Sequence, residues 1–128
     1  MDNCIIGDVT LTDQELLYLF RIGNLNKPAG IIDNSSNEVL VRNRASVLQL
    51  NEWKTRISHT TSLWQKGVLN DLRADIFKVK DGEGFNREYQ LSVPNVGLIF
   101  LQEHFTRITF KGSVCRVFEQ IDCRIAKS

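Results

Sequence analysis

The pattern of hydrophobic and polar residues is clearest in the C-terminal third of the chain, where three extended segments alternate with turns. The segments are Arg87–Val93, Leu98–Phe110 and Val114–Cys123. They are rich in Val, Ile, Phe, Tyr and Thr, which favour strands, and Pro94–Gly97 and Lys111–Ser113 supply turn residues between them. The pattern predicts a three-stranded antiparallel meander, and the rest of the chain must cover one of its faces.

The N-terminal part of the chain is predicted to open with a helix. Thr12 and Glu15 form a capping box, and Gly23 is placed to end the helix near Ile22. The consecutive residues Leu16–Phe20 make this helix apolar on more than one side. One side can pack on the chain's own sheet. The other then needs a second partner, unless both sides meet the same domain.

The middle of the chain is predicted to hold two short strands followed by helices. The strands are Ala29–Asp33 and Glu38–Arg42, with the turn Asn34–Asn37 between them. Apolar residues at helical spacing predict helices over Arg44–Asn51 and Gln65–Val79. The order is therefore helix, two strands, helices and three strands, which is typical of an α+β fold.

The composition indicates a globular protein but does not indicate a particular activity. A chain of 128 residues with 42% hydrophobic and 24% charged residues is expected to form one globular domain. A formal net charge of +1 gives no electrostatic case for direct nucleic-acid binding. No apolar run is long enough to cross a bilayer, and the N-terminus lacks the basic segment of a signal peptide. We therefore expect a cytoplasmic protein with no membrane contact.

The cysteines are expected to be reduced thiols that fill apolar space. There are three, Cys4, Cys115 and Cys123, and none has C-x-x-C spacing. Cys115 and Cys123 fall on one predicted strand at an even spacing, which predicts that both lie on the same face of the sheet, roughly 20 Å or more apart. Neither a disulfide framework nor a zinc site is expected.

The order of the predicted elements resembles that of the PAS family of signalling domains, over residues 26–125. Four local matches carry the resemblance: Pro28–Asp33 resembles the first strand, Asn43-Arg44-Ala45 the N-x-A motif after the second strand, Glu88–Leu91 the E-Y-R-L strand, and Lys111–Asp122 the glycine hairpin and last strand. The last match is partial, because Asp122 is followed by Cys123-Arg124 where the family has Ile-Thr.

The resemblance implies a five-stranded antiparallel sheet in the order 2-1-5-4-3, with helices on one face and an N-terminal capping helix. Residues 1–25 would be a lead-in and dimerisation helix, residues 26–125 the PAS-like domain, and residues 126–128 the start of a linker to an output domain. The resemblance further implies a homodimer in which the helix packs on its twin through Leu16, Leu17 and Phe20.

Candidate chemistry in the sequence is sparse. His59 and His104 have no metal-ligand neighbours, and His104 is expected to be an ordinary strand residue, with a role in a pocket as the alternative. The N-C-R-F-L-Q motif of flavin-binding PAS photosensors is absent, and Gln65–Val79 has no histidine for haem. What remains is either a small apolar ligand or no ligand at all. The aromatic residues Trp53, Trp64, Phe77, Phe85 and Phe105 would suit a pocket or a filled core equally.

The resemblance implies a sensory or regulatory PAS module of a bacterial signalling protein, and we expect no enzymatic activity. The output is expected to be a helix-turn-helix transcriptional regulator, with a histidine kinase or a cyclic-dinucleotide enzyme as alternatives. A different class of function is a ligand-free dimerisation scaffold. An enzyme would need an acid–base pair in the pocket, and the sequence pattern points to none.

Overall fold

The computed structural model describes residues 11–56, 66–93 and 97–126. Its elements in chain order are α1 (Asp13–Asn24), β1 (Ala29–Asp33), β2 (Val39–Arg42), α2 (Arg44–Arg56), α3 (Lys66–Ile76), β3 (Gly84–Val93), β4 (Gly97–Phe110) and β5 (Ser113–Ala126). The strands form one five-stranded antiparallel sheet in the order β2-β1-β5-β4-β3. The predicted fold class and strand order are confirmed.

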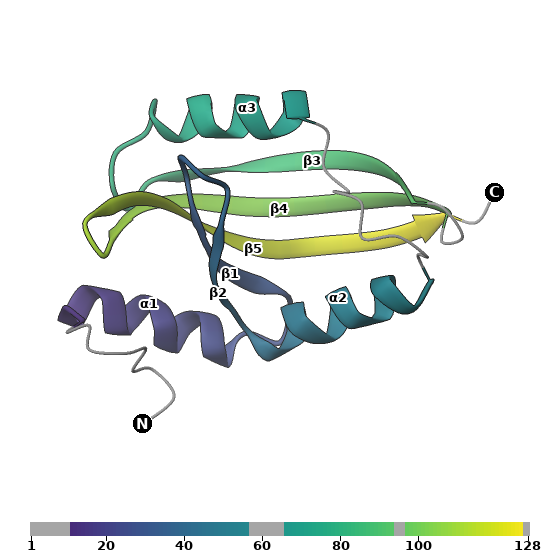
Figure 1. Ribbon diagram of the computed structural model, residues 1–128, viewed down its shortest axis with the longest axis horizontal. Helices are drawn as coiled ribbons and strands as arrows, with labels where there is room; N and C mark the ends of the chain where they lie inside the picture. Colours follow the sequence, from purple (N-terminus) through teal and green to yellow (C-terminus); the bar gives the residue numbers. More distant parts are fainter. Residues whose placement is uncertain (1–10, 57–65, 94–96, 127–128) are drawn as a thin grey trace.

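The sheet separates two hydrophobic clusters. Because side chains alternate along β4, Leu101 and Phe105 point to one face and Ile108 and Phe110 to the other. The first face carries the α3 cluster, whose buried members are Leu72, Ile76, Tyr89, Ile99, Leu101, Phe105 and Phe118. The second carries the α1 cluster, whose buried members are Ile22, Ala29, Ile31, Ile108, Phe110, Cys115 and Val117. In Figure 1, α3 and α1 lie on opposite sides of the long strands.

Helix α1 begins at the predicted capping box, and Glu15 of that box also fixes the helix to the sheet. Thr12 is the N-cap, and Glu15 Oε1 accepts a hydrogen bond from the Thr12 N–H at 2.8 Å. Glu15 Oε2 accepts a second bond from the Lys111 N–H in the β4–β5 turn at 2.6 Å. The predicted end at Gly23 is wrong, because the helix continues to Asn24. A glycine within a helix costs only about 1 kcal/mol, which packing can offset.

Asn43 joins α1, β1 and α2. Its Oδ1 accepts hydrogen bonds from the Ala29 N–H at 3.1 Å and the Ser46 N–H at 2.9 Å. Its Nδ2 donates to the Ile22 carbonyl at 3.0 Å and the Lys27 carbonyl at 2.8 Å. The asparagine of the N-x-A match is thus the buried N-cap of α2 and also holds the end of α1 beside the first strand.

Several predicted boundaries differ from those observed. Helix α2 extends beyond the predicted end at Asn51, to Arg56, and α3 ends at Ile76 instead of Val79. Strand β3 begins at Gly84, before the predicted start at Arg87, because Gly84 pairs with Thr106 of β4. A Cβ atom at Gly84 would meet the Phe105 carbonyl oxygen at 1.9 Å, so this close approach requires glycine.

A β-bulge in β5 places Cys115 and Cys123 on opposite faces of the sheet, contrary to the prediction. The pairing of β4 with β5 shifts register between Gln102 and Glu103, which adds one residue to β5. Cys115 therefore belongs to the α1 cluster, whereas Cys123 packs against the α3 cluster. The predicted common face is wrong. Burial raises the pKa of Cys115 to about 11 and also raises the pKa of Cys123, so both thiols stay protonated at neutral pH.

Candidate functional site

A cavity of about 160 Å³ lies on the α3 side of the sheet. Its lining comes from the β1–β2 hairpin, α2, α3, β4 and β5. Aliphatic and aromatic side chains make most of the wall, and they include Ile32, Val39, Leu50, Leu72, Phe105 and Phe118. Among the polar lining residues, Arg42, Glu103 and Arg116 carry charge. Ionisable groups in a mainly apolar cavity are expensive to bury, and they are therefore the first place to seek a function.

Glu103 is an acidic residue on the core-facing side of β4. It lies between Leu101 and Phe105, which share its face, and only 6% of its surface is exposed. Burial raises the pKa of Glu103 to about 7, although the positive charges of Arg116 and Arg42 oppose the shift. The carboxyl group can therefore gain or lose a proton close to neutral pH.

Arg116 on β5 is almost completely buried, with 1% of its surface exposed. Its Nη1 donates to Asn34 Oδ1 at 3.0 Å and its Nη2 donates to Asn37 Oδ1 at 2.8 Å. Both acceptors are neutral amides in the turn between β1 and β2. Arg116 Nε is buried and has no hydrogen-bond partner among the residues that the structure describes. Burial lowers the pKa of Arg116, which remains a cation near neutral pH.

Arg42, at the end of β2, is the more accessible cation of the cavity. Its Nη1 donates to Ser46 Oγ in the first turn of α2 at 2.9 Å. Its charge is close enough to Glu103 to lower the pKa of that carboxyl group. The cavity thus combines apolar walls, two guanidinium groups and one carboxyl group, an arrangement that can hold a small molecule with both an apolar and a polar part.

The helix residues predicted for a dimer interface divide between exposed and half-buried. Leu17 is 61% exposed and Phe20 44% exposed, whereas Leu16 is half-buried. The opposite side of α1 packs against the sheet through Ile22 of the α1 cluster, with Leu19 beside it. One apolar side therefore meets the chain's own sheet, and the homodimer remains a prediction.

The predicted pocket aromatics are not gathered in the cavity. Phe105 lines it, and Phe85 packs on Phe105 with ring centroids 6.0 Å apart. Phe77 is 56% exposed because α3 ends just before it, so its prediction as a pocket residue is wrong. The side chains of Trp53 and Trp64 lie outside the described residues.

His104, the histidine that the structure describes, gives no sign of a ligand site. His104 Nδ1 lies 2.6 Å from Asn86 Oδ1 on the neighbouring strand, which fits the expected strand position. His59 lies outside the described residues. Within residues 11–56, 66–93 and 97–126, no group of three His, Cys, Asp or Glu side chains is placed to hold a metal ion. Over the same residues, no helix is long and apolar enough to cross a membrane.

The charged residues of the cavity were missed in the sequence. Glu103 could have been recognised from the sequence. It occupies an inward-facing position of its strand, and its neighbours on that face are the apolar residues Leu101 and Phe105. The signal for Arg116 was weaker. It lies midway between the apolar residues Val114 and Phe118, which point to the same face of the strand. Nothing local in the sequence brings Arg42 to the cavity, since the β1–β2 hairpin and α2 place it there.

The five-stranded antiparallel sheet in the order β2-β1-β5-β4-β3, with a helix-covered cavity on one face and α1 on the other, is the PAS fold. A search of solved structures agrees. The chain is similar to the crystal structure of the PAS domain of an HTR-like protein from Haloarcula marismortui, with a TM-score of 0.54 and 12% sequence identity over 88% of this chain and 99% of that one. No protein-family model and no curated protein matches the sequence.

Proposed function

We propose that this chain is a sensory or regulatory PAS module that binds a small molecule in the cavity beside Glu103 and Arg116. The observation that carries the proposal is the burial of these two charged groups in a cavity with mainly apolar walls. A fold that needed only a filled core would be more stable with apolar residues at both positions. Their presence is explained if a ligand interacts with them.

The proposed role is binding, not catalysis. Glu103 can exchange a proton near neutral pH. However, the described lining of the cavity holds no cysteine, histidine or lysine that could act as a nucleophile or second base. The near-zero net charge supports a module without direct contact to nucleic acid. From the sequence, we further propose a cytoplasmic location and a helix-turn-helix regulator as the output.

We further propose that the module acts as a homodimer through the exposed side of α1. Leu17 and Phe20 are large apolar side chains that the chain's own sheet leaves uncovered. Light scattering of a Leu17→Glu/Phe20→Glu double variant should give the mass of a monomer, where the parent protein gives a dimer. Gln14→Glu, an exposed polar position of the same helix, is the matched control and should leave the dimer intact.

A ligand-free dimerisation scaffold is the competing function. A substitution that fills the cavity distinguishes this scaffold from a ligand-binding sensor. Val39 of β2 lines the cavity, whereas its neighbour Leu40 packs against the α1 cluster. A Val39→Phe substitution should fill the cavity and abolish small-molecule binding, while Leu40→Phe adds volume on the other face and should leave binding unchanged.

Native mass spectrometry and an NMR screen of small neutral and charged compounds would measure that binding. A co-purifying or added compound that perturbs cavity residues, and that Val39→Phe excludes, supports the sensor. Absence of any such compound from several preparations and from the screen would favour the scaffold. A ligand that binds equally to the Val39→Phe protein would place its site elsewhere.

A further inference from the structure

The charges that line the cavity do not balance. Arg42 and Arg116 contribute two positive charges, and Glu103 contributes one negative charge at most. Because the pKa of Glu103 is raised to about 7, part of that negative charge is lost at neutral pH. The described lining of the cavity therefore has a surplus of one to two positive charges, in a place where burial makes each charge count more than in water. The carboxylate of Asp33 also acts on Arg116, but it lies outside the lining and leaves the cavity itself with the surplus.

Arg116 has hydrogen-bonding capacity that its neighbours do not use. Its two printed bonds go to the neutral side-chain oxygens of Asn34 and Asn37, which hold the guanidinium group in place without neutralising it. The remaining Nε–H is buried without a partner in the part of the chain that the structure describes. A buried N–H group that makes no hydrogen bond is unfavourable, and an anionic acceptor on a ligand would satisfy it.

Arg42 supplies a second, adaptable cation at the rim. It is exposed, and its Nη1 bond to Ser46 Oγ leaves other N–H groups of the guanidinium free to turn toward a bound group. Both Arg42 and Arg116 act on the carboxyl group of Glu103. The two cations therefore converge on the same region, where each of them attracts a nearby carboxylate.

The rest of the wall limits the size and polarity of the ligand. Leu69 and Leu72 of α3 face Leu101, Phe105 and Phe118 of the sheet across the cavity. A volume of about 160 Å³ is close to that of an apolar cavity of about 150 Å³ that accepts benzene. A compact ring or a branched chain fits this space, whereas a haem or a flavin is several times larger.

We propose that the ligand is a small organic carboxylate with a compact apolar body, bound with its carboxylate toward Arg116 and Arg42 and its body among the leucine and phenylalanine side chains. This inference rests on the proposed function, because it assigns a chemical class to the ligand of the same cavity. It differs from the small apolar ligand expected from the sequence by adding an anionic group.

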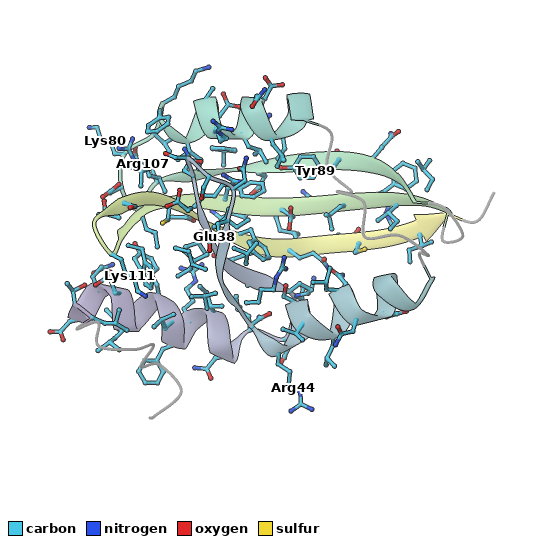
Figure 2. All side chains as sticks on the ribbon, viewed as in Figure 1. Glu38, Arg44, Lys80, Tyr89, Arg107 and Lys111 are labelled. Carbon is cyan, nitrogen blue, oxygen red and sulfur yellow. The ribbon has the colours of Figure 1, made fainter. Side chains whose placement is uncertain are left out.

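The test compares benzoate with benzyl alcohol, which has a similar ring and no charge. Isothermal titration calorimetry of the 128-residue chain at pH 7.5 should show benzoate binding at least tenfold more tightly. Arg42→Gln should weaken benzoate about tenfold or more and leave benzyl alcohol little changed, because a hydrogen bond to a charged group contributes about 1.5–3 kcal/mol. Arg44→Gln is the matched control, since Arg44 points away from the sheet at the start of α2 (Figure 2).

Two further readouts keep the test independent of how the buried arginine tolerates substitution. In the parent protein, benzoate should shift the NMR resonance of the Arg116 Nε–H group, and benzyl alcohol should shift it less. Glu103→Gln removes the competing carboxyl charge and should tighten benzoate binding several-fold. An unshifted Arg116 Nε–H signal at saturating benzoate would overturn the inference.

The outcomes separate this inference from the proposed function. If benzyl alcohol binds the cavity as tightly as benzoate, the anion assignment fails and the small-molecule cavity stands. If Arg42→Gln and Arg44→Gln weaken benzoate equally, the effect is one of general surface charge and the assignment also fails. If neither probe perturbs cavity residues and the wider screen finds no other compound, both proposals fail together.

Discussion

Two glutamates, one on each side of the sheet, expose similarly little surface but behave in opposite ways. Glu15 on the α1 side is 7% exposed, and Glu103 on the α3 side is 6% exposed. Hydrogen bonds from the backbone N–H groups of Thr12 and Lys111 lower the pKa of Glu15. Burial raises the pKa of Glu103 to about 7. Low surface exposure alone therefore does not set the state of a carboxyl group: Glu15 accepts backbone hydrogen bonds close to the protein surface, whereas Glu103 lies deep enough for the loss of hydration to dominate.

The two faces differ in the same sense as their glutamates. On the α1 face, the carboxylate ties the helix to the β4–β5 turn, and Figure 2 shows Lys111 of that turn beside the N-terminal end of α1. The surrounding α1 cluster is apolar. On the α3 face, Glu103 and Arg116 border a cavity. We interpret the first face as the one that attaches α1 to the sheet. On the second face, we interpret the buried charges as residues that lower stability and serve the proposed ligand binding.

The largest expected effect is on the α1 face. Phe110 is 1% exposed in the α1 cluster, and Phe110→Ala should lower the free energy of unfolding by about 3–5 kcal/mol. Small-molecule binding at the α3 face should persist wherever the variant remains folded. Urea denaturation measures the first effect and calorimetry the second. Phe100→Ala, at a half-buried position of the same strand, should cost clearly less, and equal costs would contradict the proposed packing.

The next effect is the pH dependence of stability contributed by Glu103. Its pKa is about 7 in the folded protein against an ordinary value of 4.5, so the folded state holds the proton more tightly. Stability should therefore fall as pH rises from about 4.5 to 7, by up to about 3 kcal/mol in total. Glu103→Gln should be more stable than the parent at pH 8 and similar to it at pH 4.5.

Urea denaturation of both proteins at the two pH values isolates this contribution, because the other titrating groups cancel in the difference. A Glu103→Gln variant that is less stable than the parent at pH 8 would show that the ionised carboxyl group is well compensated in the cavity. The contrast between the two glutamates would then be lost.

Glu15→Gln should have a smaller effect with the opposite dependence on pH. The lowered pKa of Glu15 means that its stabilisation is present above about pH 4.5 and lost as pH falls through the folded value. The substitution removes the capping-box carboxylate and one bond to Lys111, so a loss of about 1 kcal/mol is expected at pH 7. At pH 3, the urea midpoints of the parent and the variant should lie closer together than at pH 7. A gap as wide as that at pH 7 would rule out the carboxylate as its source.

The smallest effect tests a surface contact of α1. Arg21 Nη2 lies 3.1 Å from Glu119 Oε1, and the arginine side chain is 61% exposed. Exposed ion pairs contribute about 0.2–1 kcal/mol, so Arg21→Ala should lie at or below that range. Urea denaturation at low and at high salt should show the loss shrinking with salt. A loss above 2 kcal/mol would mean that α1 is held by this pair and not by Glu15 and Ile22.

The sequence predicted the fold well because local patterns and the known fold agree. The capping box at Thr12, the glycine turn at Gly112 and the apolar alternation of the late strands each act within a few residues. The site was harder to predict, because its residues come together only through the topology. Arg42 and Arg116 are brought together by the β1–β2 hairpin pairing with β5. The β5 bulge, which moved Cys123 to the other face, likewise depends on pairing with β4.

The most direct test is a titration of the two glutamate carboxyl carbons by ¹³C NMR in the same sample. We predict a pKa near 7 for Glu103 and a pKa below 4.5 for Glu15. Saturating benzoate should raise the pKa of Glu103 further, because a second negative charge nearby disfavours its ionised form, and should leave Glu15 unchanged. Two pKa values that both lie near 4.5, or a value for Glu103 that benzoate does not move, would contradict the account.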